Sequence, residues 1–173
     1  MIFKLRFGKY RLTITLSPVI DVYGVNSLLK DGTHILMWDW DNTTLEAVIA
    51  GLNIVQLIYD LPNIYVLESF KNKNYMAYCF VKVSWPKAKE IIAATPLVCE
   101  NFYKWGVFRR KFTLRISPKE GRLPKFVHTL YSDTPEECGI QDMQDFVKYE
   151  TLPRSRRGWF INLGSGNGQA RRL

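Results

Sequence analysis

Two aspartates, Asp39 and Asp41, end an apolar run that reads ILMWDWD. Alternate side chains of an extended strand point to the same face, so the sequence predicts that both carboxylates point the same way. Two like charges held together raise the free energy unless a cation or a ligand lies between them. Carboxylates that hold divalent metals support phosphoryl and nucleotidyl transfer. Asp39 and Asp41 are therefore the candidate metal-binding and catalytic residues, and the alternative is that Asp41 and Asn42 only cap the next helix.

Apolar periodicity and turn residues predict the elements that would position this pair. A capping pattern with Thr43 as N-cap predicts a helix that ends near Tyr59, and Ser84 caps a second helix that ends near residue 94. Residues 17–33 are predicted to be mostly loop. The predicted strands are residues 2–7, 11–16, 35–40, 64–69, 75–83, 112–116 and 126–130, a further helix is predicted at 134–149, and 153–173 is predicted to be a basic, flexible tail.

The order of these elements predicts the fold class. Between residues 35 and 117 the order is strand, helix, strand, strand, helix, strand, which is the split βαβ arrangement of RNA-recognition modules. We predict one α+β domain over residues 1–152, with an RRM-like core at 33–130. Its four-stranded antiparallel sheet would carry the helices on one face, with an N-terminal β-hairpin (1–17) and a C-terminal helix. The tryptophans beside Asp39 would face the helices, and Asp39, Asp41 and Arg115 would occupy an open face.

Composition and charge favour a nucleic-acid partner. The chain has 173 residues, 47% of them hydrophobic, and a net charge of +8, which favours a polyanion as partner. Basic residues are densest over residues 101–130, where aromatic residues lie between them, and cations with flat rings suit single-stranded nucleic acid. The alternative is a solvated basic loop with aromatic residues in the core. The candidate nucleic-acid contacts are Lys104, Arg109, Arg110, Lys111 and Lys125.

The cysteines and the hydropathy pattern favour a cytoplasmic setting. Cys79, Cys99 and Cys138 are odd in number, far apart and without a C-x-x-C pair, which argues against a disulfide scaffold and a structural zinc site. The stretch MIFKLRFGKY alternates apolar and charged residues, and no later segment is long and apolar enough to span a membrane. We therefore expect no secretion signal and no membrane partner.

The run ILMWDWD resembles the first motif of the archaeo-eukaryotic primase and primase-polymerase superfamily, which includes replication primases of plasmids and phages. The resemblance extends over about residues 33–126 and implies an RRM-like catalytic core. It implies that Asp39 and Asp41 bind Mg²⁺ or Mn²⁺, which activate a 3′ hydroxyl and hold a nucleoside triphosphate. The implied activity is nucleotidyl transfer in DNA replication, most simply on single-stranded DNA.

Two further motifs of that superfamily are matched in part. LESFKNKNYMAYCF has the layout of the second motif, with Ser69 in the turn and Met76 in place of the expected histidine. FTLRISPKEGRLPK corresponds to the third motif, in which Arg115, Lys119 and Arg122 would neutralise the triphosphate. This strand lacks the acid of the motif, and Glu68 or Glu100 could replace it.

Two other functions remain open from the sequence. An RRM-like protein that has lost catalysis would bind single-stranded nucleic acid only. DWDNT also resembles the D-x-D-x-T motif of haloacid-dehalogenase-type phosphatases, which implies that Asp39 is a nucleophile, Asp41 a general acid and magnesium the cofactor. That fold requires parallel strands, and the short turn after Ser69 favours an antiparallel partner strand instead.

Overall fold

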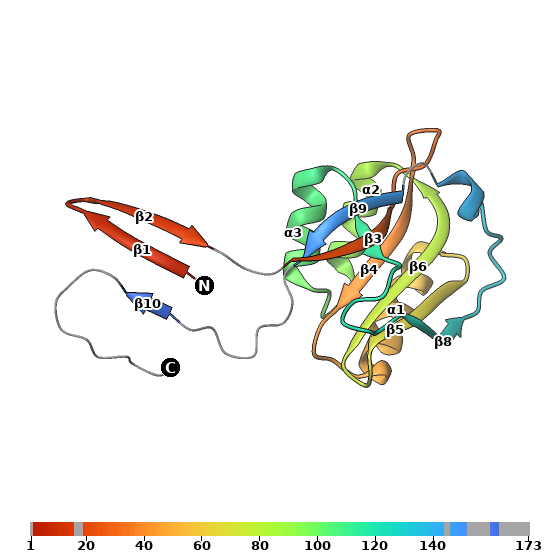
Figure 1. The fold of residues 1–173 in the computed structure, drawn as a ribbon. Coiled ribbons are helices and arrows are strands. Elements are labelled where there is room, and N and C mark those ends of the chain that lie inside the picture. Colours follow the sequence, from red (N-terminus) through yellow and green to blue (C-terminus); the bar gives the residue numbers. More distant parts are fainter. Residues whose placement is uncertain (1, 16–18, 144–145, 152–159, 163–173) are drawn as a thin grey trace. The chain divides into compact units, whose positions relative to one another are not determined.

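The computed structural model describes residues 2–15, 19–143, 146–151 and 160–162 (Figure 1). Its contacts divide the chain into two compact units. One unit comprises Met1–Asp21 with Glu150–Leu173, and the other comprises Val22–Tyr149. The sequence predicted one domain over residues 1–152, and the contacts divide this range between the two units. The second unit contains the hydrophobic core and the candidate site.

The first unit contains a three-stranded sheet. Strands β1 (Ile2–Phe7) and β2 (Tyr10–Thr15) form an antiparallel hairpin, which confirms the predicted N-terminal hairpin. Gly8 lies in its turn with φ +57°, a conformation that glycine adopts without steric cost. Strand β10 (Phe160–Asn162) pairs in parallel with β1. Apart from this strand, the predicted basic tail at 153–173 lies outside the described residues.

The second unit is built on a four-stranded antiparallel sheet, as predicted. Strand order is β4-β6-β5-β8, and each of the three pairings is antiparallel. Helix α1 is capped by Thr44, one residue after the predicted Thr43, because the Thr44 hydroxyl accepts from the Ala47 amide. Helix α2 is capped by Ser84 as predicted. The elements are β4 (His34–Trp40), α1 (Leu45–Tyr59), β5 (Ile64–Phe70), β6 (Asn74–Val83), α2 (Trp85–Ala94) and β8 (Lys125–Leu130).

The fourth strand of this sheet is β8, and the prediction that residues 112–116 fill this place is wrong. That segment forms the short strand β7 (Thr113–Arg115), which pairs with β3 (Ile20–Asn26) in a second sheet of order β7-β3-β9. Residues 20–26 were predicted as loop. A Cβ on Gly24 would lie 2.7 Å from the Leu114 carbonyl oxygen, so the two strands approach this closely only because residue 24 is glycine.

The predicted C-terminal helix at 134–149 is also wrong. This segment contains a 3₁₀ turn (Ile140–Asp142) and strand β9 (Phe146–Thr151). The Glu137 amide donates to the Phe80 carbonyl (3.0 Å), and the Glu137 carboxylate accepts from the Lys82 amide (2.6 Å). These long-range bonds hold residue 137 against the end of β6.

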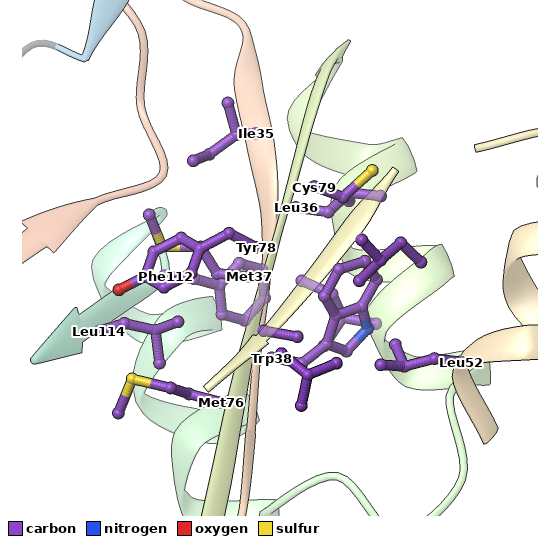
Figure 2. Close-up of a cluster of buried hydrophobic side chains, with 14 of the residues drawn as sticks. Ile35, Leu36, Met37, Trp38, Leu52, Met76, Tyr78, Cys79, Phe112 and Leu114 are labelled. Carbon is purple, nitrogen blue, oxygen red and sulfur yellow. The ribbon is translucent and has the colours of Figure 1, made fainter. Parts of the chain in front are cut away.

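Strand β4 has a core on each side. Trp38 and Trp40 are fully buried on the helix side, as predicted, while Met37 is fully buried on the other side. Figure 2 shows Trp38, Leu52 and Cys79 on one side of the strand and Met37, Met76, Tyr78, Phe112 and Leu114 on the other. The second face of the sheet was predicted to be open, but side chains from β6 and β7 and Phe112 bury it next to β4.

A further helix, α3 (Glu100–Arg109), precedes β7 and was not predicted. It packs on Phe112, whose ring centroid lies 5.2 Å from that of Phe102 and 5.1 Å from that of Trp85. Gly106 is the point of closest approach, because a Cβ there would lie 2.2 Å from the Phe112 ring. The helix therefore holds its position only with glycine at residue 106.

We expect Gly106→Ala to lower the free energy of unfolding by about 1–3 kcal/mol, measured by urea denaturation. Alanine favours a helix over glycine by about 1 kcal/mol, so a loss of stability would have to come from the clash with Phe112. Gly51→Ala in α1 is the matched control, because a Cβ there lies 3.4 Å from Pro96 in ordinary contact. This control should be neutral or stabilising, and equal effects of both substitutions would contradict the packing described.

Candidate metal centre

The two aspartates lie at the end of β4, where the strand leaves the sheet. Asp39 is half-buried and pairs across the ladder with Met76 of β6, while Asp41 is exposed in the turn that leads to α1. Trp38 and Trp40 fix the orientation of this strand end, because their indole nitrogens donate to the Thr95 hydroxyl (2.8 Å) and the Pro96 carbonyl (3.1 Å). With both indoles held on the helix side, alternation places the Asp39 side chain on the opposite face.

A third side chain, Cys99, joins the two aspartates from the N-cap of α3. Its amide donates to the Asp39 carbonyl (2.8 Å), and its thiol donates to an Asp41 carboxylate oxygen (3.3 Å). One ligand atom from each of Asp39, Asp41 and Cys99 lies within 4.8 Å of the others. This group, the Asp39–Asp41–Cys99 cluster, has the size of a metal-binding site.

The donor set defines which ions the cluster suits. Two carboxylates offer the oxygen ligands that Mg²⁺ and Mn²⁺ prefer, and Mg²⁺ usually binds through one or two carboxylates together with water and substrate phosphates. A cysteine adds a soft ligand that suits Zn²⁺ better than Mg²⁺, and it must lose its proton to bind. Burial raises the pKa of the Cys99 thiol. The oxygen atoms of Asp39 and Asp41 therefore fit Mg²⁺ or Mn²⁺ without the sulfur.

Asn74, at the start of β6, holds Asp41 in place. Its side-chain amide donates to an Asp41 carboxylate oxygen, and its amide oxygen accepts from the Asn42 backbone (3.4 Å). The Ser69 hydroxyl donates to the Asn74 carbonyl (3.4 Å). Ser69 lies near the end of β5, within the strand predicted at 64–69, and this contact places it next to the residue that bonds Asp41.

Asp39 lies in an environment that disfavours its charge. Burial and, to a smaller extent, the Asp41 charge raise the pKa of this carboxyl, Arg115 opposes both effects, and the net result is a rise from 3.8 to about 7. Among the described residues, no hydrogen bond or ion pair holds the Asp39 carboxylate. The phenols of Tyr78 and Tyr149 also lie within range of this charge, and burial raises the pKa of each. A cation at the cluster would relieve the electrostatic cost of ionising Asp39.

Arg115 reaches this environment from β7. Its guanidinium donates to the carbonyls of Ser117 and Arg122, the latter at 3.0 Å. Arg122 lies over the Phe70 ring at 4.6 Å and pairs with Glu120. Of the three predicted phosphate-binding cations, Arg115 therefore lies within electrostatic range of Asp39 and is bonded to the backbone of Arg122.

Lys119 lies in a tight turn with Arg122. Each backbone amide of this pair donates to the other's carbonyl at 3.0 Å. Lys119 and Arg122 therefore stay neighbours in the loop between β7 and β8.

The predicted nucleic-acid contacts fall on two elements. Lys104 and Arg109 lie in α3, Arg110 is its left-handed C-cap residue, and Lys111 follows. Lys125 begins β8, at the opposite edge of the central sheet from β4. The structure therefore gathers four of the five residues at one helix.

Sequence reasoning missed Cys99 and Asn74. Cys99 lies 58 residues after Asp41, and no spacing pattern connects a lone cysteine with an acid pair at that distance. The acids that could have replaced the missing third carboxylate lie elsewhere, since Glu68 accepts from the Asn72 amide (2.7 Å) and Glu100 pairs with Lys104 (2.7 Å).

No protein-family model matches the sequence, and comparisons with curated proteins and with solved structures also return no match. Among the residues that the structure describes, no helix combines the length and the apolar character needed to cross a membrane. The function must therefore be argued from the geometry of the Asp39–Asp41–Cys99 cluster and its surroundings.

The raised pKa of Asp39 predicts how stability depends on pH. Between pH 4 and 7 the folded protein binds the Asp39 proton more tightly than the unfolded chain does, so this carboxyl destabilises the fold progressively as pH rises. We expect Asp39→Asn to remove this dependence and to exceed the wild type in free energy of unfolding at pH 8 by on the order of 1 kcal/mol or more.

Urea denaturation of both proteins from pH 5 to pH 8 measures this difference. Other titrating groups affect both proteins equally, so their effect cancels in the difference between the two free energies of unfolding. Mn²⁺ should raise the stability of the wild type more at pH 8 than at pH 6, and it should have little effect on Asp39→Asn. Parallel pH profiles for the two proteins would contradict the burial of this carboxyl.

Proposed function

We propose that this protein is a metal-dependent nucleotidyltransferase of DNA replication, similar to a primase or primase-polymerase. The observation that carries the proposal is the approach of Asp39, Asp41 and Cys99 to within 4.8 Å of one another, with the Arg115 charge acting on Asp39. A site that brings together carboxylates and a guanidinium can hold a divalent cation and the phosphates that the cation binds.

Each residue then has a role in the transfer. A bound divalent metal would lower the pKa of the 3′ hydroxyl and bind the triphosphate. Asp39 and Asp41 bind and orient the ion, and Arg115 neutralises charge on the phosphates. A bond forms between the 3′ oxygen and the α-phosphorus, the bond from that phosphorus to the pyrophosphate oxygen breaks, and the hydroxyl proton passes to water.

The positions of the other motif residues support this proposal. Met76 pairs directly with Asp39 across the β4–β6 ladder, so the place where the resemblance expects a histidine adjoins the acid pair. Ser69 lies one hydrogen bond from Asn74, which in turn bonds Asp41. Arg115, from the segment matched to the third motif, bonds the Arg122 carbonyl and lies within electrostatic range of Asp39.

Two differences from the motifs of the primase superfamily favour a second function. The third member of the cluster is a cysteine, and the segment matched to the third motif lacks the acid that the resemblance expects. Met76 also cannot contact phosphate as a histidine would. A protein that binds single-stranded nucleic acid without synthesis is therefore the alternative. The phosphatase has less support, because the pairings of the central sheet are antiparallel and that fold requires parallel strands.

The decisive experiment is extension of a primer on single-stranded DNA with deoxynucleoside triphosphates and Mn²⁺ or Mg²⁺. We expect extension by the wild type and a loss of at least about 100-fold in Asp39→Asn and Asp41→Asn, because the metal would lose a ligand. Asp133→Asn, which changes another exposed aspartate, is the matched control and should keep full activity.

Each other outcome identifies a different function. DNA binding without extension under either ion would show the binding-only protein. Phosphate release from a small phosphomonoester, lost in Asp39→Asn, would show the phosphatase.

A further inference from the structure

Helix α3 separates a run of aromatic residues into two faces. Phe102, Tyr103 and Gly106 face inward, with the rings of Phe102 and Tyr103 at 5.2 and 6.2 Å from that of Phe112. Trp105 and Phe108 face outward and are 56% and 78% exposed. Packing of the core therefore accounts for the inner aromatic residues and leaves the two outer ones without a structural role.

The outer pair forms an ordered group with a cation. The Trp105 and Phe108 rings meet edge to face at 5.8 Å, and the Arg109 guanidinium lies 5.2 Å from the Trp105 ring centroid. Residues three and four apart share one face of a helix, so these three side chains form one surface. We call this surface, made of Trp105, Phe108 and Arg109, the Trp105 platform.

Basic residues outnumber acidic ones around the Trp105 platform, where Glu100 pairs with Lys104. Residues 101–119 contain six lysines or arginines and no aspartate or glutamate. Arg110 and Lys111 follow the platform directly at the end of α3. Exposed rings beside a cation-rich helix end complement a ligand that offers flat apolar groups and negative charge together.

The platform is also linked to the acid pair. The N-cap of α3 is Cys99, which bonds Asp41, and a helix rises about 1.5 Å per residue, so Trp105 lies roughly 9 Å further along the helix axis. The charges of both Arg109 and Arg115 act on the Tyr149 phenol, as does that of Asp39. Arg109 of the platform and Asp39 of the acid pair therefore both lie within electrostatic range of Tyr149.

We propose that the Trp105 platform binds a single-stranded nucleic acid by stacking its bases on Trp105 and Phe108, while Arg110 and Lys111 contact its phosphates. This proposal rests on the proposed function in one respect: the bound strand would serve as the template for synthesis at Asp39 and Asp41. Binding at the platform does not itself require catalysis.

The test measures binding of two fluorescent 20-nucleotide strands, oligo(dT) and a strand of abasic sites, by anisotropy. The wild type should bind oligo(dT) more tightly, because only that strand has bases that can stack. In the double variant Trp105→Ala, Phe108→Ala, affinity for oligo(dT) should fall roughly 10- to 100-fold and the preference for bases should disappear. The variant Trp105→Phe, Phe108→Tyr keeps the rings and should keep the preference.

Controls separate stacking from charge and from folding. Tyr131→Ala removes another exposed aromatic residue, 83% exposed and outside α3, and it should bind both strands as the wild type does. Arg110→Gln with Lys111→Gln should weaken binding of both strands and reduce the salt dependence of affinity. Since Trp105 and Phe108 are exposed, the double variant should also keep the wild-type melting temperature.

The proposal is overturned if the double alanine variant keeps the wild-type preference for oligo(dT), which would leave the platform to another class of partner such as a protein. It is also overturned if the wild type binds both strands equally. Asp39→Asn should bind both strands normally. If primer extension fails while the preference for oligo(dT) persists, the proposed function is contradicted and strand binding at the Trp105 platform is supported.

Discussion

The structure depends on the way two tryptophans fix the end of one strand. Trp38 and Trp40 are fully buried and donate hydrogen bonds to Thr95 and Pro96, which follow α2. A shift of β4 by one residue would turn both indoles to the other side of the strand, away from the Thr95 and Pro96 oxygens that accept from them. The register of β4 is therefore fixed, and with it the side of the sheet to which Asp39 belongs.

That orientation imposes an electrostatic cost on the fold. Asp39 must lie half-buried beside the charge of Asp41, and Arg115 offsets only part of the resulting rise in its pKa. Asn74 and Cys99 hold Asp41 close to it rather than letting the two acids separate. An arrangement that keeps like charges together at a cost in stability is typical of a site that binds a cation.

Helix α3 connects this site with the Trp105 platform. Its N-cap residue, Cys99, lies against the acids, and Gly106 lets its inner face contact Phe112 closely. The same packing directs Trp105 and Phe108 into solvent. One helix therefore fixes both the third side chain of the cluster and the position of the exposed aromatic residues.

The sequence by itself determined the α+β class, the N-terminal hairpin and the alternation of tryptophan and aspartate in β4, because these depend on short-range periodicity and capping. Tertiary structure alone decided which segment completes the sheet, that residues 134–149 avoid a helix, and that Cys99 joins the acids. Those outcomes depend on contacts between residues far apart in the chain, such as Gly24 against Leu114 and Glu137 against Phe80. Local sequence patterns carry no information about such partners.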